Sequence, residues 1–171
     1  MKRLVVLSVV LWVLLVSSSA FSQSFTDKAK KDHAVDMSDE DPAMQQAMER
    51  ARTGLEAFLR KAEAPPPNTD QYSVKVRVSE GDNQEYLWVS NLKGRGDLWS
   101  GRIANLPMLR SVKKGQSYSF AKTEIVDWIY IDKSKKKVFG NFTTCALLTK
   151  EPPGVAESIQ NQYGLECDLQ P

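Results

Sequence analysis

The sequence IVDWIYIDKSKKKVFGNFT, residues 125–143, contains the clearest strand pattern of the chain. It consists of an apolar run, a lysine-rich turn and a second apolar run that contains a glycine. In the first run, apolar side chains alternate onto both faces, which predicts a strand buried on both sides. The turn at residues 132–135 and the return of residues 138–142 predict a hairpin. Gly140 inside the second strand indicates a bulge or a close approach of another backbone.

Asp127 stands out in the first run because its neighbours are apolar on both faces. An ionised carboxylate in such a place costs free energy unless it is hydrogen-bonded or paired. A structural carboxylate would accept backbone N–H bonds or pair with an arginine, whereas a functional acid would lie in a cleft. The sequence favours the structural role and leaves the functional one open.

The first 22 residues have the pattern of a secretory signal peptide. Lys2 and Arg3 precede an apolar run over residues 4–16, and small residues follow at a cleavage site. Cleavage would give a mature chain that begins between Phe21 and Gln23. No cysteine stands directly after the site, so a lipoprotein anchor is not expected. We therefore expect an exported protein, periplasmic or secreted, with no stable membrane anchor after cleavage.

Residues 23–40 are polar, charged and aperiodic, which predicts a disordered leader before a single domain over residues 41–171. The only histidine, His33, lies in this leader. Serine–histidine and cysteine–histidine nucleophiles and histidine-based metal sites are therefore not expected in the folded part. No metal or cofactor is predicted.

The balance of basic and acidic residues indicates whether the protein binds nucleic acid. The chain has 23 basic and 21 acidic residues, and removing Lys2 and Arg3 with the signal leaves 21 of each sign. Binding to nucleic acid needs a basic excess or a basic face. The lysines of residues 133–137 are explained by a solvated turn, so we do not expect nucleic acid as a partner.

A helix is predicted to begin at Asp41-Pro42, because aspartate is a favoured N-cap and proline suits the first helical position. Apolar residues then recur at spacings of three and four: Met44, Ala47, Met48, Ala51, Leu55, Phe58 and Leu59. Gly54 within this pattern costs about 1 kcal/mol relative to alanine, which indicates a close crossing against a strand. Pro65-Pro66-Pro67 ends the helix.

Three further strands are predicted where apolar and polar residues alternate between turns, at residues 72–78, 86–92 and 98–104, and residues 112–120 hold a Lys-Lys-Gly turn and a short fourth strand. With the hairpin described above, they make about six short antiparallel strands. A short helix is predicted at residues 155–163, followed by Gly164. The predicted fold is α+β: an N-terminal amphipathic helix packed on a curved antiparallel sheet or small barrel, with a short C-terminal helix.

Cys145 and Cys167 are the only cysteines, and an even count in an exported chain favours a disulfide. Cys145 is expected at the end of the last strand and Cys167 in the C-terminal tail. The bond would hold the C-terminal helix against the sheet and close a loop of about 22 residues, worth roughly 3 kcal/mol in the chain-entropy model. A redox pair of the Cys-x-x-Cys type lacks the required spacing.

An ordered series of short motifs runs through the domain: Asp41-Pro42-x-Met44, Ala51-Arg52, Leu55-x-x-Phe58, Val74-Lys75-Val76, Glu85-x-x-Trp88-Val89, Gly101, Asn105-x-Pro107, Val112-Lys113-x-Gly115, Ile125-x-Asp127-Trp128-x-Tyr130 and Gly140-Asn141-Phe142-Thr143. Over residues 41–148 this series resembles the YegJ-like family of small bacterial proteins, also called domain of unknown function 2314. The family has no established activity, so the resemblance implies a class and no chemistry.

The chain departs from that family at two positions. The family usually has a histidine where this chain has Tyr86, and an arginine where it has Cys145. The resemblance implies that a site using those two residues with Asp127 is altered here. The arginine would be the natural partner of the aspartate, and Arg102 or Lys75 would have to replace it.

A non-catalytic binding or protein-interaction module is the expected function, with an unknown protein or a small ligand as partner. Its candidate binding residues are Asp127, Trp128, Trp88, Tyr86 and Asn105. Five aromatic side chains would supply a binding face, although at least three are expected in the core: Tyr86, Trp88, Trp99, Trp128 and Tyr130. The alternatives are a protective, immunity-type partner protein and, less favoured, a hydrolase that uses carboxylates such as Asp127 and Glu85.

Overall fold

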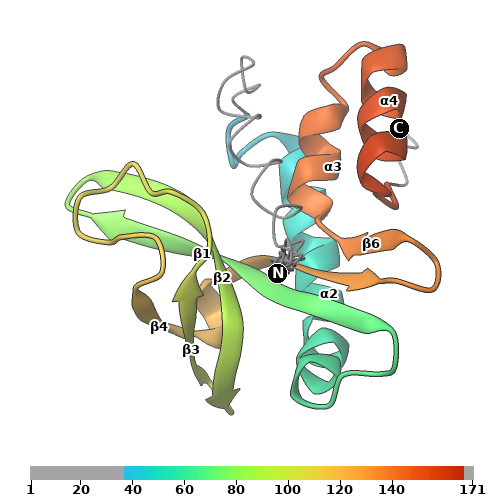
Figure 1. The fold of residues 1–171 in the computed structure, drawn as a ribbon. Helices are drawn as coiled ribbons and strands as arrows, with labels where there is room; N and C mark the ends of the chain where they lie inside the picture. Colours follow the sequence, from blue (N-terminus) through green and yellow to red (C-terminus); the bar gives the residue numbers. More distant parts are fainter. Residues whose placement is uncertain (1–36, 168–171) are drawn as a thin grey trace, which may run out of the picture.

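A computed structural model describes residues 37–167 of the chain (Figure 1). The predicted signal peptide and most of the predicted leader lie outside these residues. The described elements are α2 (Pro42–Glu63), β1 (Thr69–Glu80), β2 (Asn83–Arg95), β3 (Leu98–Ile103), β4 (Ser117–Ala121), a 3-10 turn η1 (Lys122–Glu124), β5 (Ile125–Asp132), β6 (Lys137–Gly140), α3 (Phe142–Leu148) and α4 (Pro153–Tyr163). None of the helices in this part of the chain is long and apolar enough to cross a membrane.

The helix α2 begins as predicted. The side chain of Asp41 accepts a hydrogen bond from Ala43 N, and Pro42 occupies the first turn. The buried side chains of the helix follow the predicted stripe: Met44, Ala47, Ala51, Leu55, Phe58 and Leu59. Residues 65–67 follow its C-terminal end, where the three prolines cannot continue the helix.

The six strands form one sheet in the order β4-β3-β2-β1-β5-β6, and every neighbouring pair is antiparallel. The strand number and the α+β class agree with the prediction. The sheet is curved and is not closed: β4 lies at one edge, and β6 at the other edge pairs only with β5 and with the short segment after α4, so the barrel alternative is not realised (Figure 1). The strands β1 and β2 are longer than predicted, at 12 and 13 residues, because backbone pairing continues through their polar ends.

The two faces of the sheet carry different side chains. On β1, Val74, Val76 and Val78 are almost fully buried in the cluster that also contains Phe58 of α2. The alternate residues of β1 lie on the other face, where Lys75 is paired in register with Trp88 on β2 and with Asp127 on β5. We call the first face the core face and the second the open face. The candidate site lies on the open face.

The end of the predicted hairpin differs from the prediction. The strand β6 stops at Gly140, and residues 142–148 form the helix α3 rather than extending the strand. Gly140 and Asn141 both have left-handed backbone angles, with φ of 81° and 57°. A Cβ on Gly140 would lie 2.1 Å from Trp128 O, which confirms the predicted close backbone approach. This left-handed pair turns the chain out of the sheet and places Cys145 in a helix, not at the end of a strand.

Smaller differences concern the loop after β3 and the last helix. Residues 104–116 contain no strand, and the short fourth strand predicted within residues 112–120 is β4 at Ser117–Ala121. Glu85 fixes this loop by accepting hydrogen bonds from Met108 N and Leu109 N, at 2.8 and 3.1 Å. The helix α4 begins two residues earlier than predicted and ends, as predicted, at left-handed Gly164.

The predicted disulfide joins Cys145 of α3 to Cys167, with their Cα atoms 5.4 Å apart. The segment after α4 also pairs with β6: Val138 N donates to Gly164 O at 2.8 Å, and Val138 forms a parallel bridge with Leu165. Leu165 packs with Leu148 of α3 and Ala156 of α4. The C-terminal segment is therefore fixed to α3 by a covalent bond and to β6 by backbone pairing.

Reducing this disulfide should destabilise the protein. The bond closes a loop across 22 residues, and the chain-entropy model assigns such a loop about 3 kcal/mol. We expect the thermal midpoint to fall when the wild-type protein is reduced, and also in Cys145→Ser. A Cys145→Ser/Cys167→Ser double variant serves as the control, since its midpoint should not respond to reductant. Two free thiols in peptide maps of protein purified without reductant would contradict this expectation.

Candidate functional site

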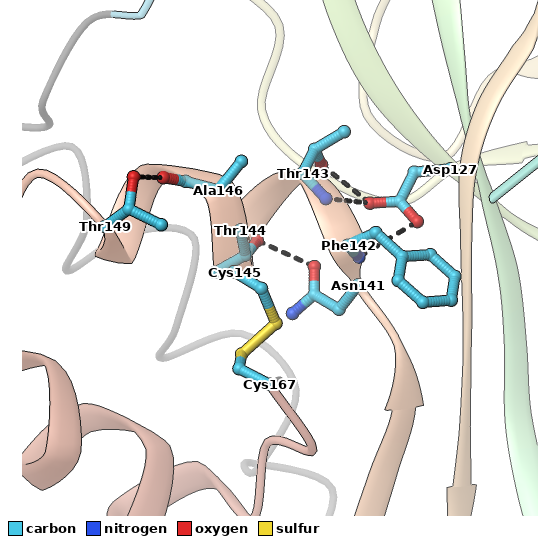
Figure 2. The surroundings of a disulfide bond; sticks show 9 residues. All are labelled: Asp127, Asn141, Phe142, Thr143, Thr144, Cys145, Ala146, Thr149 and Cys167. Carbon is cyan, nitrogen blue, oxygen red and sulfur yellow. Dashed lines mark hydrogen bonds between the residues drawn. A yellow bond between two sulfur atoms is a disulfide. The ribbon is translucent and has the colours of Figure 1, made fainter. Parts of the chain in front are cut away.

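Asp127 is fully buried and accepts four hydrogen bonds, three of which are drawn in Figure 2. Its Oδ1 accepts from Trp128 N at 2.8 Å and from Phe142 N at 3.2 Å. Its Oδ2 accepts from Thr143 N at 2.8 Å and from Thr143 Oγ1 at 2.6 Å. Because the first amides of a helix have no partner inside the helix, Asp127 acts as an N-cap supplied by a neighbouring strand.

The residue in the N-cap position of α3 does not fill this role itself. Asn141 makes no side-chain bond to the backbone of the helix. Its Oδ1 accepts instead from Thr144 Oγ1 at 2.7 Å (Figure 2). The hydrogen bonds to the first turn of α3 are therefore accepted by Asp127 of β5 and not by the side chain of Asn141. This geometry supports the structural interpretation of Asp127.

Lys75, rather than an arginine, supplies the positive charge near Asp127. Its Nζ donates to Thr143 Oγ1 at 2.5 Å, and the same hydroxyl donates to Asp127. Burial lowers the pKa of Lys75, an effect that the charge of Asp127 opposes. Burial likewise raises the pKa of Asp127, opposed first by Lys75 and then by Thr143. Arg102, the other suggested partner, donates instead to Gly115 O at 2.9 Å.

Trp128 lies on the core face and is not part of the open face. Its indole Nε1 donates to Ala51 O at 2.8 Å, and its ring stacks on Phe58 with centroids 5.0 Å apart. A Cβ on Gly54 would meet the Trp128 ring at 2.7 Å, which confirms the predicted close crossing at this glycine. Trp99 and Tyr130 are also buried. Three of the five candidate aromatic residues therefore serve packing, as expected.

Tyr86 lies on the open face and connects it to the segment before α2. Its hydroxyl donates to Asp39 and accepts from Arg77 Nη2 at 3.1 Å. The Arg77 guanidinium also lies 5.6 Å from the centre of the Tyr86 ring. Burial is the main cause that raises the pKa of Tyr86, followed by its bond to Asp39. Tyr86 is thus engaged within the protein.

The two remaining candidates, Trp88 and Asn105, line a groove of about 700 Å³ on the open face. Asn105 Oδ1 accepts from Trp88 N at 2.8 Å, so the two residues are directly joined. Lys75 Nζ lies 4.8 Å from the centre of the Trp88 ring and restrains it. The structure therefore brings Trp88 and Asn105 together, and it places Asp127, Trp128 and Tyr86 outside the groove lining.

Sequence reasoning missed most of the groove. Its further lining includes residues of β1, β2, β5, β6 and the end of α4: Ser73, Ser90, Ile129, Ile131, Val138, Tyr163 and Leu165. The alternation of the strands indicated which of these residues share a face. No sequence pattern indicated where α4 and the segment after it would lie, because the contact of this segment with β6 joins residues far apart in the chain.

A larger hollow, of about 970 Å³, lies between α2, α3 and α4. Small side chains form much of its lining, including Ala47, Ala146 and Ala156. Among the described residues of the lining, Phe142 is the only aromatic one, and the Arg50 guanidinium lies 5.6 Å from that ring. Because ligand sites usually combine aromatic walls with several convergent polar groups, we regard the groove on the open face as the better candidate.

The carboxylates that a hydrolase would use are separated. Asp127 lies on the open face, and Glu85 lies on the core face because its position alternates with that of Trp88 on β2. Both accept backbone N–H bonds, Asp127 from α3 and Glu85 from the loop after β3. Within residues 37–167, no group of three or more histidine, cysteine, aspartate or glutamate side chains is arranged to hold a metal ion.

Replacing Asp127 with asparagine should destabilise the fold. The NH2 group of asparagine cannot accept the hydrogen bonds that one carboxylate oxygen of Asp127 accepts. Buried N–H or O–H donors would therefore lose their acceptor. We expect a loss of about 1–3 kcal/mol in the free energy of unfolding, measured by chemical denaturation. Asp97→Asn is the control, because the Asp97 side chain is 91% exposed. An unchanged midpoint and slope for Asp127→Asn would show that this carboxylate is not part of the scaffold.

Comparisons with known proteins agree with the resemblance in the sequence. The family model described as "Uncharacterized protein conserved in bacteria (DUF2314)" matches residues 41–167. The curated "Uncharacterized protein YegJ" of Escherichia coli (strain K12) is 25% identical over 119 residues, which cover 69% of this chain and 75% of that protein. No solved structure matches the chain. The family match spans most of the chain and all of its described helices and strands, and the protein belongs to this bacterial family of unknown function, DUF2314.

Proposed function

We propose that the protein is an exported, non-catalytic binding module whose ligand occupies the groove on the open face. The observation that carries this proposal is the groove itself, about 700 Å³ in volume and lined by Trp88, Asn105 and Tyr163. Small-molecule sites are typically clefts of roughly 300–1,000 Å³ with aromatic walls and a few placed polar groups. The groove fits this description in size and composition.

The groove is held in shape before any ligand arrives. Asn105 fixes the backbone of Trp88, and Lys75 restrains the ring. On the other side, the disulfide and the pairing of Val138 with Leu165 fix the end of α4. A preformed site loses less conformational entropy on binding, which supports a binding role for this face.

Export is part of the proposal. The first 22 residues have the pattern of a signal peptide, and the described domain contains a disulfide. Disulfides persist in the bacterial periplasm and outside the cell, where thiols are not kept reduced. A periplasmic or secreted location is consistent with both features.

The absence of catalysis is also a proposal, and it rests on the two carboxylates. Asp127 and Glu85 lie on opposite faces of the sheet, and each is occupied by backbone donors. A pair of carboxylates that shares one substrate would have to face the same cleft. The geometry therefore favours binding over carboxylate-based hydrolysis.

One observation favours the alternative of a protective partner protein. The loop after β3 presents Leu106 and Met108 at exposures of 58% and 76%, although Glu85 holds the backbone of the loop. Apolar side chains on a fixed loop are suited to a protein interface. A protein partner that requires these two side chains, and not the groove, would favour this alternative.

Filling the groove should abolish ligand binding. Ser90 lies in the groove and Ser119 is exposed on β4, so Ser90→Tyr and Ser119→Tyr form a matched pair of the same substitution. We expect at least one compound among neutral oligosaccharides, short peptides and fatty acids to raise the thermal midpoint of the wild type and of Ser119→Tyr, with no rise in Ser90→Tyr. If no compound binds, or if Ser90→Tyr binds as well as wild type, the groove is not the site.

A further inference from the structure

We infer that the groove binds a neutral oligosaccharide; this inference rests on the proposed binding function and specifies its ligand class. Three properties of the lining lead to it: little charge, many side-chain amides and hydroxyls, and aromatic rings. Each of these properties alone is compatible with several ligands. Together they match a ligand that has many hydroxyl groups, apolar C–H faces and no net charge.

The charge of the lining disfavours anionic ligands. Of its 20 described residues, Asp70 alone carries a charged side chain, although 26% of the residues of the chain are charged, so about five would be expected. The Oδ2 atom of Asp70 is paired with Lys133 Nζ at 2.6 Å, whereas its buried Oδ1 atom has no hydrogen-bond partner among the described residues. A phosphate or carboxylate ligand would find no cation among the described lining residues to replace its lost hydration, and Asp70 Oδ1 remains as an acceptor for a hydroxyl group of a sugar.

The polar groups of the lining suit hydroxyl groups. Side-chain amides and hydroxyls line the groove in number: Gln71, Ser73, Ser90, Asn91, Asn105, Asn141 and Gln162. An amide offers two donors and an acceptor, and a hydroxyl both donates and accepts, as each sugar hydroxyl does. The Oδ1 atoms of Asn105 and Asn141 accept bonds within the protein, which leaves their NH2 groups as donors for a ligand.

The aromatic rings suit the C–H face of a sugar. Trp88 lines the groove from β2, and Tyr163 lines it from the end of α4. An aromatic ring has a negative face that attracts weakly positive C–H groups, and its flat apolar surface packs against a flat partner. The cation at Lys75 Nζ holds the Trp88 ring in place at 4.8 Å, so the ring need not be ordered on binding.

Two other ligand classes fit less well. An extended peptide is usually bound by pairing with the edge of a sheet. The groove lies over β1, β2 and β5, which are flanked on both sides by neighbouring strands, and over β6, where residues 164–166 already pair with Val138. A fatty acid would bury the amides and hydroxyls without partners, which costs free energy for each group. It would also need a cation for its carboxylate, and the described lining has none.

The experiment measures binding by calorimetry with five probes: maltotetraose, cellotetraose, chitotetraose, tetra-alanine and decanoate. We expect the mature wild-type protein to bind at least one of the three oligosaccharides and neither of the other probes. Trp88→Ala should raise the dissociation constant of that oligosaccharide at least about tenfold, and Trp88→Phe should raise it less because the ring is kept. Trp99→Phe is the control, since Trp99 is buried with its Nε1 bonded to Gly96 O.

Gln162→Ala is a second variant whose stability should not change, because Gln162 is exposed on the surface of α4. It should weaken oligosaccharide binding severalfold if the groove is the site. Binding of tetra-alanine or decanoate in place of the oligosaccharides, sensitive to Ser90→Tyr, would overturn the ligand class and leave the proposed function standing. Oligosaccharide binding that is unaffected in Trp88→Ala and Gln162→Ala would place the sugar elsewhere and overturn the inference. Failure of all five probes to bind would count against both.

Discussion

The contact between Asp127 and the first amides of α3 is the interaction on which the rest of the open face depends. Three of the four hydrogen bonds to this carboxylate come from Phe142 and Thr143 and anchor a seven-residue helix to β5. A helix this short is not stable alone in water, so α3 needs an external cap. Thr143 extends the contact to Lys75, and Lys75 in turn restrains Trp88. One buried carboxylate is therefore connected to the groove through two side chains.

The same helix connects the sheet to the C-terminal segment. The disulfide of Cys145 joins α3 to the residues after α4, and Leu148 of α3 packs in one cluster with Ala156 and Leu165. These contacts set the position of α4, whose last residue, Tyr163, lines the groove together with Leu165. The wall of the groove is thus built on a helix whose start is fixed by Asp127. The same arrangement of β5, α3 and α4 therefore gives Asp127 its structural role and gives the groove the shape on which the proposed binding function rests.

The structural features that depend on neighbouring residues in the chain were predictable from the sequence. The start of α2 at Asp41-Pro42, the alternation of the strands and the buried position of Asp127 all follow from neighbouring residues. The helix α3 was not predicted, because its sequence FTTCALL begins with aromatic and β-branched residues that favour strands, and because its cap comes from another strand. The groove was only partly predicted: alternation placed Trp88 on a face, but the wall formed by α4 depends on contacts that no local pattern encodes.

Amide hydrogen exchange at Thr143 tests the capping of α3 by Asp127 most directly. Thr143 is the second residue of α3, and its N–H donates to Asp127 Oδ2 at 2.8 Å. Gly154 is the second residue of α4, whose N-cap residue makes no side-chain bond, and it is exposed. After correction for intrinsic rates, the amide of Thr143 should exchange at least about tenfold more slowly than that of Gly154. Equal rates at the two positions would contradict the capping of α3 from β5.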